Sequence, residues 1–295
     1  MKPYNKSLLQ KSKPYLIISP AIVAILIFYI YPIAAQFALS FTDWNLIREE
    51  NNFIGLKNYR ALFASREFRR VLGNTLTYTL CFVFITLSLA LLMAFFLTAN
   101  TRFNRFVQSV IFLPHITALI SVAMVFMWLM DPQIGLFNYI LGLLGLPGLR
   151  WLESAKTSMM SVVIVNVWKS VGYYALVLLA ALKGVPPDIY EAAALDNASR
   201  IKTFFKITIP MISPTLFFLL VVMTITSFNV FDTVSVMTSG GPANSTNVMV
   251  YYIYQNAFAN MKIGYASAAG TVLLLIVGVM TFFYFKFLSE KVHYR

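Results

Sequence analysis

Long apolar segments are the feature that most constrains what this chain can fold into. The bilayer core is about 30 Å thick, and a helix needs about 20 predominantly apolar residues to cross it. A spanning segment must also satisfy its own backbone polar groups, which favours a helix. The sequence therefore predicts an all-α membrane protein with six transmembrane helices. They are Tyr15–Gln36, Leu76–Leu97, Val107–Leu129, Met159–Leu182, Pro214–Val234 and Ala266–Phe287.

Composition excludes several other classes of protein. Hydrophobic residues make up 59% of the chain and charged residues 12%, against about 45–50% and about 25% in soluble domains. The single cysteine, Cys81, excludes a disulfide framework and a multi-cysteine metal site. The two histidines, His115 and His293, lie too far apart for an HExxH zinc motif. The net charge of +12 could suggest nucleic acid. However, the basic residues lie between apolar segments, where they anchor loops to lipid headgroups, so we expect no nucleic-acid binding.

The distribution of basic residues predicts the topology. Lysines precede the first apolar segment, which is longer than the 7–15 residues of a signal peptide and has no cleavage site after it, so we interpret it as a retained signal anchor. The basic residues favour a cytoplasmic location for both termini. The predicted organisation is a cytoplasmic N-terminus (1–14), a first helix (15–36), an extracytoplasmic loop carrying a short helix (37–71), a helical core (72–288) with a cytoplasmic loop (183–213), and a cytoplasmic C-terminus (289–295).

The cytoplasmic loop carries signals for two helices joined by a tight turn. Pro187 can occupy the first position of a helix, and Asp188 favours the positive end of its dipole. Asn197 tolerates the left-handed geometry that ends a helix, and Ser199 can cap a second one. The second helix has apolar helical spacing at Ile201, Phe204, Phe205 and Thr208. The sequence predicts a helix–turn–helix elbow, and the plainer interpretation is an amphipathic connector between two membrane helices.

This elbow resembles the EAA signature of ABC-importer permeases: Glu-Ala-Ala, then Asp-Gly-Ala, then a hydrophobic stretch ending in proline. The matching residues are Glu191, Ala192, Ala193, Asp196, Asn197, Ala198, Phe205, Ile207, Pro210 and Pro214. The family's glycine is replaced by Asn197, and asparagine also visits left-handed geometry. The resemblance implies that these residues contact an ATPase subunit and that Glu191 meets it. Alternatively, Glu191 only stabilises its own helix.

Other stretches resemble the maltose-type carbohydrate branch of this family, and the resemblance spans nearly the whole chain. They are residues 53–59, Phe231-Asp232, Met237–Pro242, Ile253-Tyr254, Ala257-Phe258 and Ser289–Val292. The resemblance implies a type I importer permease of the MetI-like fold in the plasma membrane of a prokaryote. It further implies a turn facing a solute-binding protein at Gly240, Gly241 and Pro242.

The same resemblance implies the partners and the mechanism. The chain would pair with a second related permease, two ATP-binding cassette subunits and an extracytoplasmic solute-binding protein, with membrane lipid around it. The solute would be sugar-like, with di- and oligosaccharides, sugar acids, polyols and glycerol phosphates all allowed. The sequence has no GxxxxGK[ST] phosphate loop. ATP and magnesium would therefore bind in the partner ATPase subunits, and this chain would bind no cofactor or metal and have no enzymatic activity. The partner ATPase subunits would drive alternating access of the permease.

A few polar and aromatic residues within the apolar segments are candidates for the solute pathway. Lys169 lies near the middle of the fourth segment, where a charge is costly. It either lines the pathway, or it snorkels or pairs with a carbonyl or carboxylate inside the bundle, with Asp232 as a conceivable partner. Aromatic faces combined with hydrogen-bonding groups suit sugars. Candidates of this kind are Tyr173, Tyr174, Phe228, Asn229 and Phe231, each of which could also be plain packing.

Two other classes of function compete with the importer. An ion-coupled secondary carrier needs repeated halves with broken helices and membrane acids, and Asp232 is the single acidic candidate. An intramembrane enzyme needs a catalytic set within the bilayer, and none is visible. His115, which follows Pro114, is interpreted as packing near a kink rather than as a proton relay.

Overall fold

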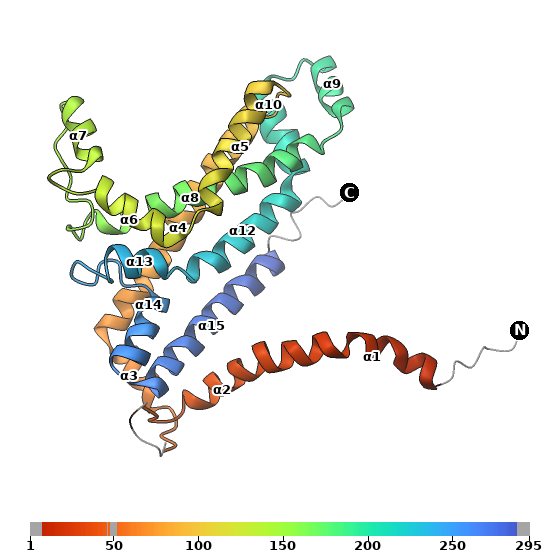
Figure 1. Ribbon diagram of the computed structural model, residues 1–295. Helices are drawn as coiled ribbons and strands as arrows, with labels where there is room; N and C mark the ends of the chain where they lie inside the picture. Colours follow the sequence, from red (N-terminus) through yellow and green to blue (C-terminus); the bar gives the residue numbers. More distant parts are fainter. Residues whose placement is uncertain (1–7, 46, 48–51, 288–295) are drawn as a thin grey trace, which may run out of the picture. The chain divides into compact units, whose positions relative to one another are not determined.

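The computed structural model describes residues 8–45, 47 and 52–287 (Figure 1). Within these ranges the regular structure is helical, with one isolated antiparallel bridge between Thr42 and Phe53. Five of the described helices are long and apolar enough to cross a membrane, and a bent pair makes a sixth span if it is counted as one. The number of spans agrees with the prediction. Arg48, one of the basic residues of the predicted outer loop, and the motif Ser289–Val292 lie outside the described residues.

The chain divides into two compact units, and the smaller one contains Met1–Ala64 and Ile253–Val272. Its first span, Tyr15–Leu39, is built from α1 (Leu8–Ile25), the π-helical turn η1 (Leu26–Ile30) and α2 (Tyr31–Leu39). No residue in the most apolar stretch of this span is buried, as expected of a helix that meets lipid or another subunit. The remaining helical parts of the unit are α3 (Lys57–Ala64), η3 (Gln255–Ala259), the end of α14 and the start of α15.

Within this smaller unit, α3 anchors the chain that leaves α2, and it confirms the short helix predicted in the outer loop. The Asn58 side-chain amide donates to the carbonyl oxygens of Ser40 at 2.9 Å and Thr42 at 2.8 Å. The start of α15 approaches the same chain so closely that a Cβ on Gly264 would overlap the Thr42 carbonyl oxygen. Glycine at this position is therefore required by packing.

The larger unit contains Ser65–Tyr252 and Leu273–Arg295, and its core forms where α4 and α12 pack on α8. Buried aromatic and aliphatic side chains fill this core, among them the stacked rings of Tyr78 and Phe82 at 5.8 Å. The helices with residues in this unit are α4 (Arg66–Phe96), α5 (Arg102–Ile116), α6 (Leu119–Leu129), α7 (Leu136–Leu143), α8 (Ser158–Lys183), α9 (Pro187–Leu195), α10 (Arg200–Thr203), η2 (Phe204–Thr208), α11 (Ile209–Met211), α12 (Ser213–Phe228), α13 (Asp232–Met237), α14 (Met249–Tyr254) and α15 (Ile263–Phe287).

The second span begins earlier than hydropathy predicts. Helix α4 starts at Arg66, whereas the sequence predicts Leu76 as the first residue and places 66–71 in the outer loop. The Ser65 side chain caps α4 by accepting from the Phe68 backbone N–H at 3.3 Å. The charged first turns were missed because hydropathy locates the lipid boundary, not the end of the helix.

The third span is not the single helix predicted over Val107–Leu129. Helix α5 ends at Ile116 and α6 begins at Leu119, with a bend of 99° between them. Pro114 lacks a backbone N–H and weakens the last turn of α5. Thr117 and Ala118 then adopt extended backbone angles, which complete the break.

The fifth span is also broken, contrary to the continuous helix predicted over Pro214–Val234. Helix α12 ends at Phe228, residues 229–231 are not helical, and α13 begins at Asp232. Helix α13 packs against α6 and α8. A small apolar cluster joins these three helices: Val122, Ala123, Phe126, Met130, Val165 and Met237.

Candidate functional site

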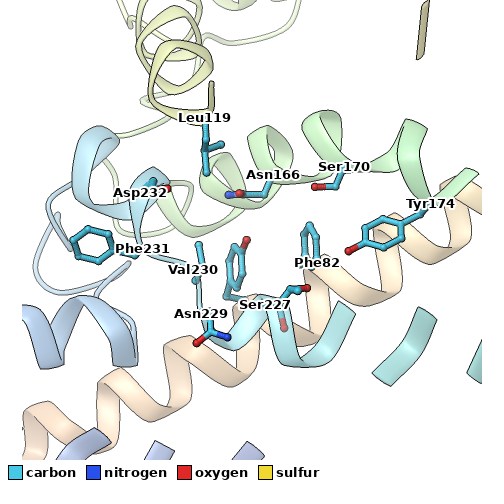
Figure 2. A pocket seen from close by; sticks show the side chains of 12 residues that line it. Phe82, Leu119, Asn166, Ser170, Tyr174, Ser227, Asn229, Val230, Phe231 and Asp232 are labelled. Atoms are coloured by element: carbon cyan, nitrogen blue, oxygen red, sulfur yellow. The ribbon is translucent and has the colours of Figure 1, made fainter. Parts of the chain in front are cut away.

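The two broken spans meet α4 and α8 around a cavity of about 200 Å³ in the larger unit (Figure 2). Its lining combines aromatic rings with hydroxyl, amide and carboxylate groups. The lining residues are Tyr78, Phe82, Leu119, Asn166, Ser170, Tyr174, Thr226, Ser227, Asn229, Val230, Phe231 and Asp232. The last four of these come from the break between α12 and α13 and its edges, so the break supplies one side of the cavity.

Hydrogen bonds hold the amide groups of the cavity in place. The Asn166 side-chain amide donates to the Val162 carbonyl at 2.9 Å, and its oxygen accepts from the Thr233 hydroxyl at 3.1 Å. The Asn229 amide donates to the Ile225 carbonyl at 3.0 Å, which leaves its oxygen available as an acceptor. These groups are therefore positioned before any solute arrives.

Four of the predicted pathway residues line this cavity, and three do not. The four are Tyr174, Asn229, Phe231 and Asp232. Phe228 is buried at 1% exposure, and Tyr173 stacks on His115 with ring centres 4.4 Å apart, which agrees with a packing role for that histidine.

The third, Lys169, bonds to the end of α5 instead. Its ammonium nitrogen donates to the carbonyl oxygens of Pro114 at 3.2 Å, His115 at 2.9 Å and Thr117 at 2.7 Å. Asp232, the conceivable carboxylate partner, does not pair with Lys169, because the one ion pair among the described residues joins Arg150 and Glu153. Its carbonyl partners lie at the end of α5, a location that the sequence does not reveal.

Sequence reasoning missed the lining residues on α4 and most of those on α8. A signal for α8 exists: Asn166, Ser170 and Tyr174 are spaced by four residues, which places them on one face of an otherwise apolar helix. No comparable signal marks Tyr78 and Phe82, because they are apolar or aromatic residues among many in α4.

The cytoplasmic elbow has the predicted turn. Helix α9 starts with Pro187, and Asn197 has a left-handed φ of 50° just after the helix ends. The Asn197 backbone N–H donates to the Ala194 carbonyl and the Ala198 N–H to the Ala193 carbonyl, both at 3.0 Å. This pair of bonds is a Schellman motif.

The second half of the elbow presents two different faces. The Ser199 side chain caps α10 by accepting from the Lys202 N–H at 3.3 Å, as predicted. The predicted apolar stripe is divided. Phe204 packs edge-on against Phe95 at 5.3 Å and Thr208 is buried. By contrast, Ile201 and Phe205 are exposed by 73% and 65%, and so is Leu195 at the end of α9, by 85%. Such an exposed apolar group indicates a surface that meets another molecule.

The turn at Gly240 to Pro242 is held from two sides. The Thr246 hydroxyl donates to the Gly241 carbonyl at 2.7 Å, and Gly240 has a positive φ of 80°. Helix α4 fixes the next residues, because the Asn74 amide donates to the carbonyls of Asn244 at 2.8 Å and Asn247 at 3.0 Å. The turn, which is buried at Gly240 and half-buried at Gly241 and Pro242, is therefore a preformed loop.

The described part of the chain contains no cluster of side chains that could bind a metal ion. No group of three or more His, Cys, Asp or Glu side chains comes together in the described part of the chain.

In the loop after α6, backbone N–H groups of Ile134 at 2.9 Å and Gln133 at 2.8 Å donate to the Asp131 carboxylate and hold its pKa below its usual value. This carboxylate serves the local turn.

Comparison with known proteins identifies the family. Residues 86–294 match the family described as "Binding-protein-dependent transport system inner membrane component". The chain belongs to this family. One relative of this permease is the probable ABC transporter permease protein YurN of Bacillus subtilis (strain 168), 37% identical over 93% of this chain and 95% of that protein. Another is the sn-glycerol-3-phosphate transport system permease protein UgpA of Pectobacterium atrosepticum, 33% identical over 96% of both chains.

The solved structures that resemble this permease are importer subunits. A chain of a bacterial ABC transporter involved in the import of the acidic polysaccharide alginate is 25% identical, with a TM-score of 0.84 over 97% of this chain and 98% of that chain. A chain of the alginate transporter in complex with an alginate pentasaccharide-bound periplasmic protein gives 0.85 at 25% identity, over 98% of this chain and 100% of that one.

These findings confirm the main predictions. The chain is a multi-pass inner-membrane permease subunit of an ABC importer with the MetI-like fold, and it is not an ion-coupled carrier. Its relatives are likewise permease subunits of transporters.

Proposed function

We propose that this permease imports a carbohydrate or a related polyol or sugar derivative through the cavity between α4, α6, α8, α12 and α13. The observation that carries the proposal is the make-up of that cavity. The rings of Phe82, Tyr174 and Phe231 line it. The hydroxyl of Ser170 and the carboxylate of Asp232, which makes no hydrogen bond or ion pair with the described residues, line it as well. Aromatic faces with a few fixed polar groups suit a polyhydroxylated solute.

The proposed coupling surface is the elbow, whose residues match the EAA signature from Glu191 to Pro210. Its exposed apolar side chains and the rigid turn at Asn197 support docking into a cleft of an ATP-binding cassette subunit. ATP and magnesium would bind in two such subunits, since this sequence has no phosphate-binding loop. The permease then transmits movement between the elbow and the cavity and catalyses no reaction itself.

The remaining proposed partners are a second related permease and a solute-binding protein. The preformed loop at Gly240, Gly241 and Pro242 would face the binding protein outside the cell, with both termini in the cytoplasm. The structural relative solved with a periplasmic protein supports such an assembly.

A reconstituted complex tests the proposed function directly. The cognate binding protein is first screened against maltose, other di- and oligosaccharides, sugar acids, polyols and glycerol 3-phosphate. ATP-driven uptake of the selected solute is then measured in proteoliposomes. Uptake that persists with inactivated ATPase subunits, or a binding protein that retains only solutes unrelated to sugars and polyols, would refute the proposal.

Charge reversal tests the coupling surface separately. Glu191→Lys should reduce ATPase co-purification or uncouple ATP hydrolysis from uptake, because reversing a partly buried ion pair costs about 2–5 kcal/mol. Glu153→Lys is the matched control, since Glu153 lies in the loop before α8. Membrane insertion should be normal in both variants. If Glu191→Lys and the control behave alike, Glu191 does not contact the ATPase.

A further inference from the structure

The position of Lys169 in α8 leaves it no route to water along the helix axis. At about 1.5 Å per residue, its Cα lies about 17 Å from the start of α8 and about 21 Å from the end. A lysine side chain has a four-carbon stem and cannot cover either distance. Its charge must therefore be satisfied inside the protein or in a cavity.

The end of α5 provides what this charge needs. The last carbonyl groups of a helix have no partner within the helix, and the chain leaves α5 in an extended conformation at Thr117. The ammonium group has three N–H donors, and three carbonyl oxygens, those of Pro114, His115 and Thr117, accept from it. A cation at the C-terminal end of a helix is also favoured by the helix dipole.

The neighbouring residues of α8 show that this contact is part of a fitted interface. A Cβ on Gly172 would overlap the Ile111 carbonyl oxygen, so glycine lets the α5 backbone touch α8. One residue further along, the ring of Tyr173 lies parallel to that of His115, with an interplanar angle of 10°. The end of α5 is thus fixed on α8 within about one helical turn.

The same turn of α8 forms one side of the cavity. Ser170 follows Lys169 and lines the cavity, and Leu119, the first residue of α6, lines it from beyond the break (Figure 2). We propose that Lys169 is a positioning residue that holds the broken α5–α6 span on α8 and so sets the shape of the cavity, without contacting the solute. This inference rests on the proposed function only for the cavity's role in transport.

Distances between spin labels test the positioning role without a solute. In a Cys81→Ser background, one label pair replaces Leu80 of α4 and Ile120 of α6, and a reference pair replaces Leu80 and Phe218 of α12. All three positions are exposed. In the assembled complex, Lys169→Met should shift or broaden the Leu80–Ile120 distance and leave the Leu80–Phe218 distance unchanged. Lys169→Arg, which keeps the charge and the donors, should restore the first distance.

Uptake kinetics provide the second readout, with Lys156→Met as the matched control in the loop before α8. Lys169→Met should raise the KM for uptake of the screened solute about tenfold, since a small misplacement of a binding site is costly, while basal ATP hydrolysis stays unchanged. Lys169→Gln keeps two N–H donors, so its KM should lie between those of the wild type and Lys169→Met. It replaces Lys169→Met if the complex with that variant does not assemble. The inference is overturned if the Leu80–Ile120 distance is unchanged in both Lys169→Met and Lys169→Gln. It is also overturned if both label pairs are disturbed equally. If the wild-type complex imports nothing, the proposed function fails, whereas the distances still decide the role of Lys169.

Discussion

Replacement of Asn197 is the most direct test of the elbow, because one backbone angle carries the turn. With φ at 50°, this residue lies in the left-handed region, which costs most L-residues about 1–2 kcal/mol and which glycine and, less often, asparagine adopt. A β-branched residue tolerates this region least. The perturbation is therefore Asn197→Val, compared with Asn197→Gly.

The structure gives the size of the effect. Valine must either keep the left-handed angle or leave it and release the two backbone bonds to Ala193 and Ala194. Each such bond is worth about 1 kcal/mol, so either route costs about 2 kcal/mol. That corresponds to about a 30-fold decrease in the equilibrium for the native elbow. Asn197→Gly should change it little or favour it, since glycine adopts this angle readily.

Co-purification of the ATPase subunits and the ATP hydrolysed per solute imported measure the outcome. Asn197→Val should lose most of the ATPase and couple poorly, while Asn197→Gly should match the wild type. Asn244→Val is the matched control, because Asn244 also has a positive φ, at 58°, but lies in the loop after α13. If Asn197→Val retains the ATPase as well as this control does, the turn does not position the coupling surface.

Two further predictions follow from local geometry. Gly172→Ala should destabilise the detergent-purified complex by about 1–3 kcal/mol, measured as a lower melting temperature, because its new Cβ overlaps the Ile111 carbonyl oxygen. Gly278→Ala, with open space around it, should not, and equal losses would contradict the close approach. Because the folded-state pKa of Asp131 is depressed, its stabilisation of the loop is present above the usual carboxyl pKa and is lost as pH falls through the depressed value. The protection factors for amide exchange of the two N–H groups bonded to it should fall over that acidic range in the wild type and already be low at neutral pH in Asp131→Ala.

Sequence patterns predicted the structural features that depend on residues close together in the chain. The elbow is the best example, since the left-handed turn at Asn197 and the cap at Ser199 follow from neighbouring residues alone. The first span was also placed within a few residues, because lipid contact is read directly from hydropathy. Where the chain meets the ATPase stays a prediction from motif resemblance.

The breaks and the cavity needed tertiary structure. Hydropathy sums over a window, so it does not register that Thr117 leaves the helix while its apolar neighbours remain within the same span. Asn229 begins the second break without a proline or glycine as a signal. A carbonyl partner for Lys169 is among the alternatives that the sequence allows, but which carbonyl groups accept from it could not be predicted, because they are free only where one helix ends against another.

The bond from Lys169 also has a consequence for how the protein is made. Its three carbonyl partners precede it by 55, 54 and 52 residues. At about 5–20 residues per second, the ribosome adds that length in roughly 3–10 seconds. During this interval the end of α5 has left the ribosome without the group that satisfies it in the finished protein. The three bonds that satisfy the end of α5 therefore form only after Lys169 has been synthesised and α8 has reached the end of α5.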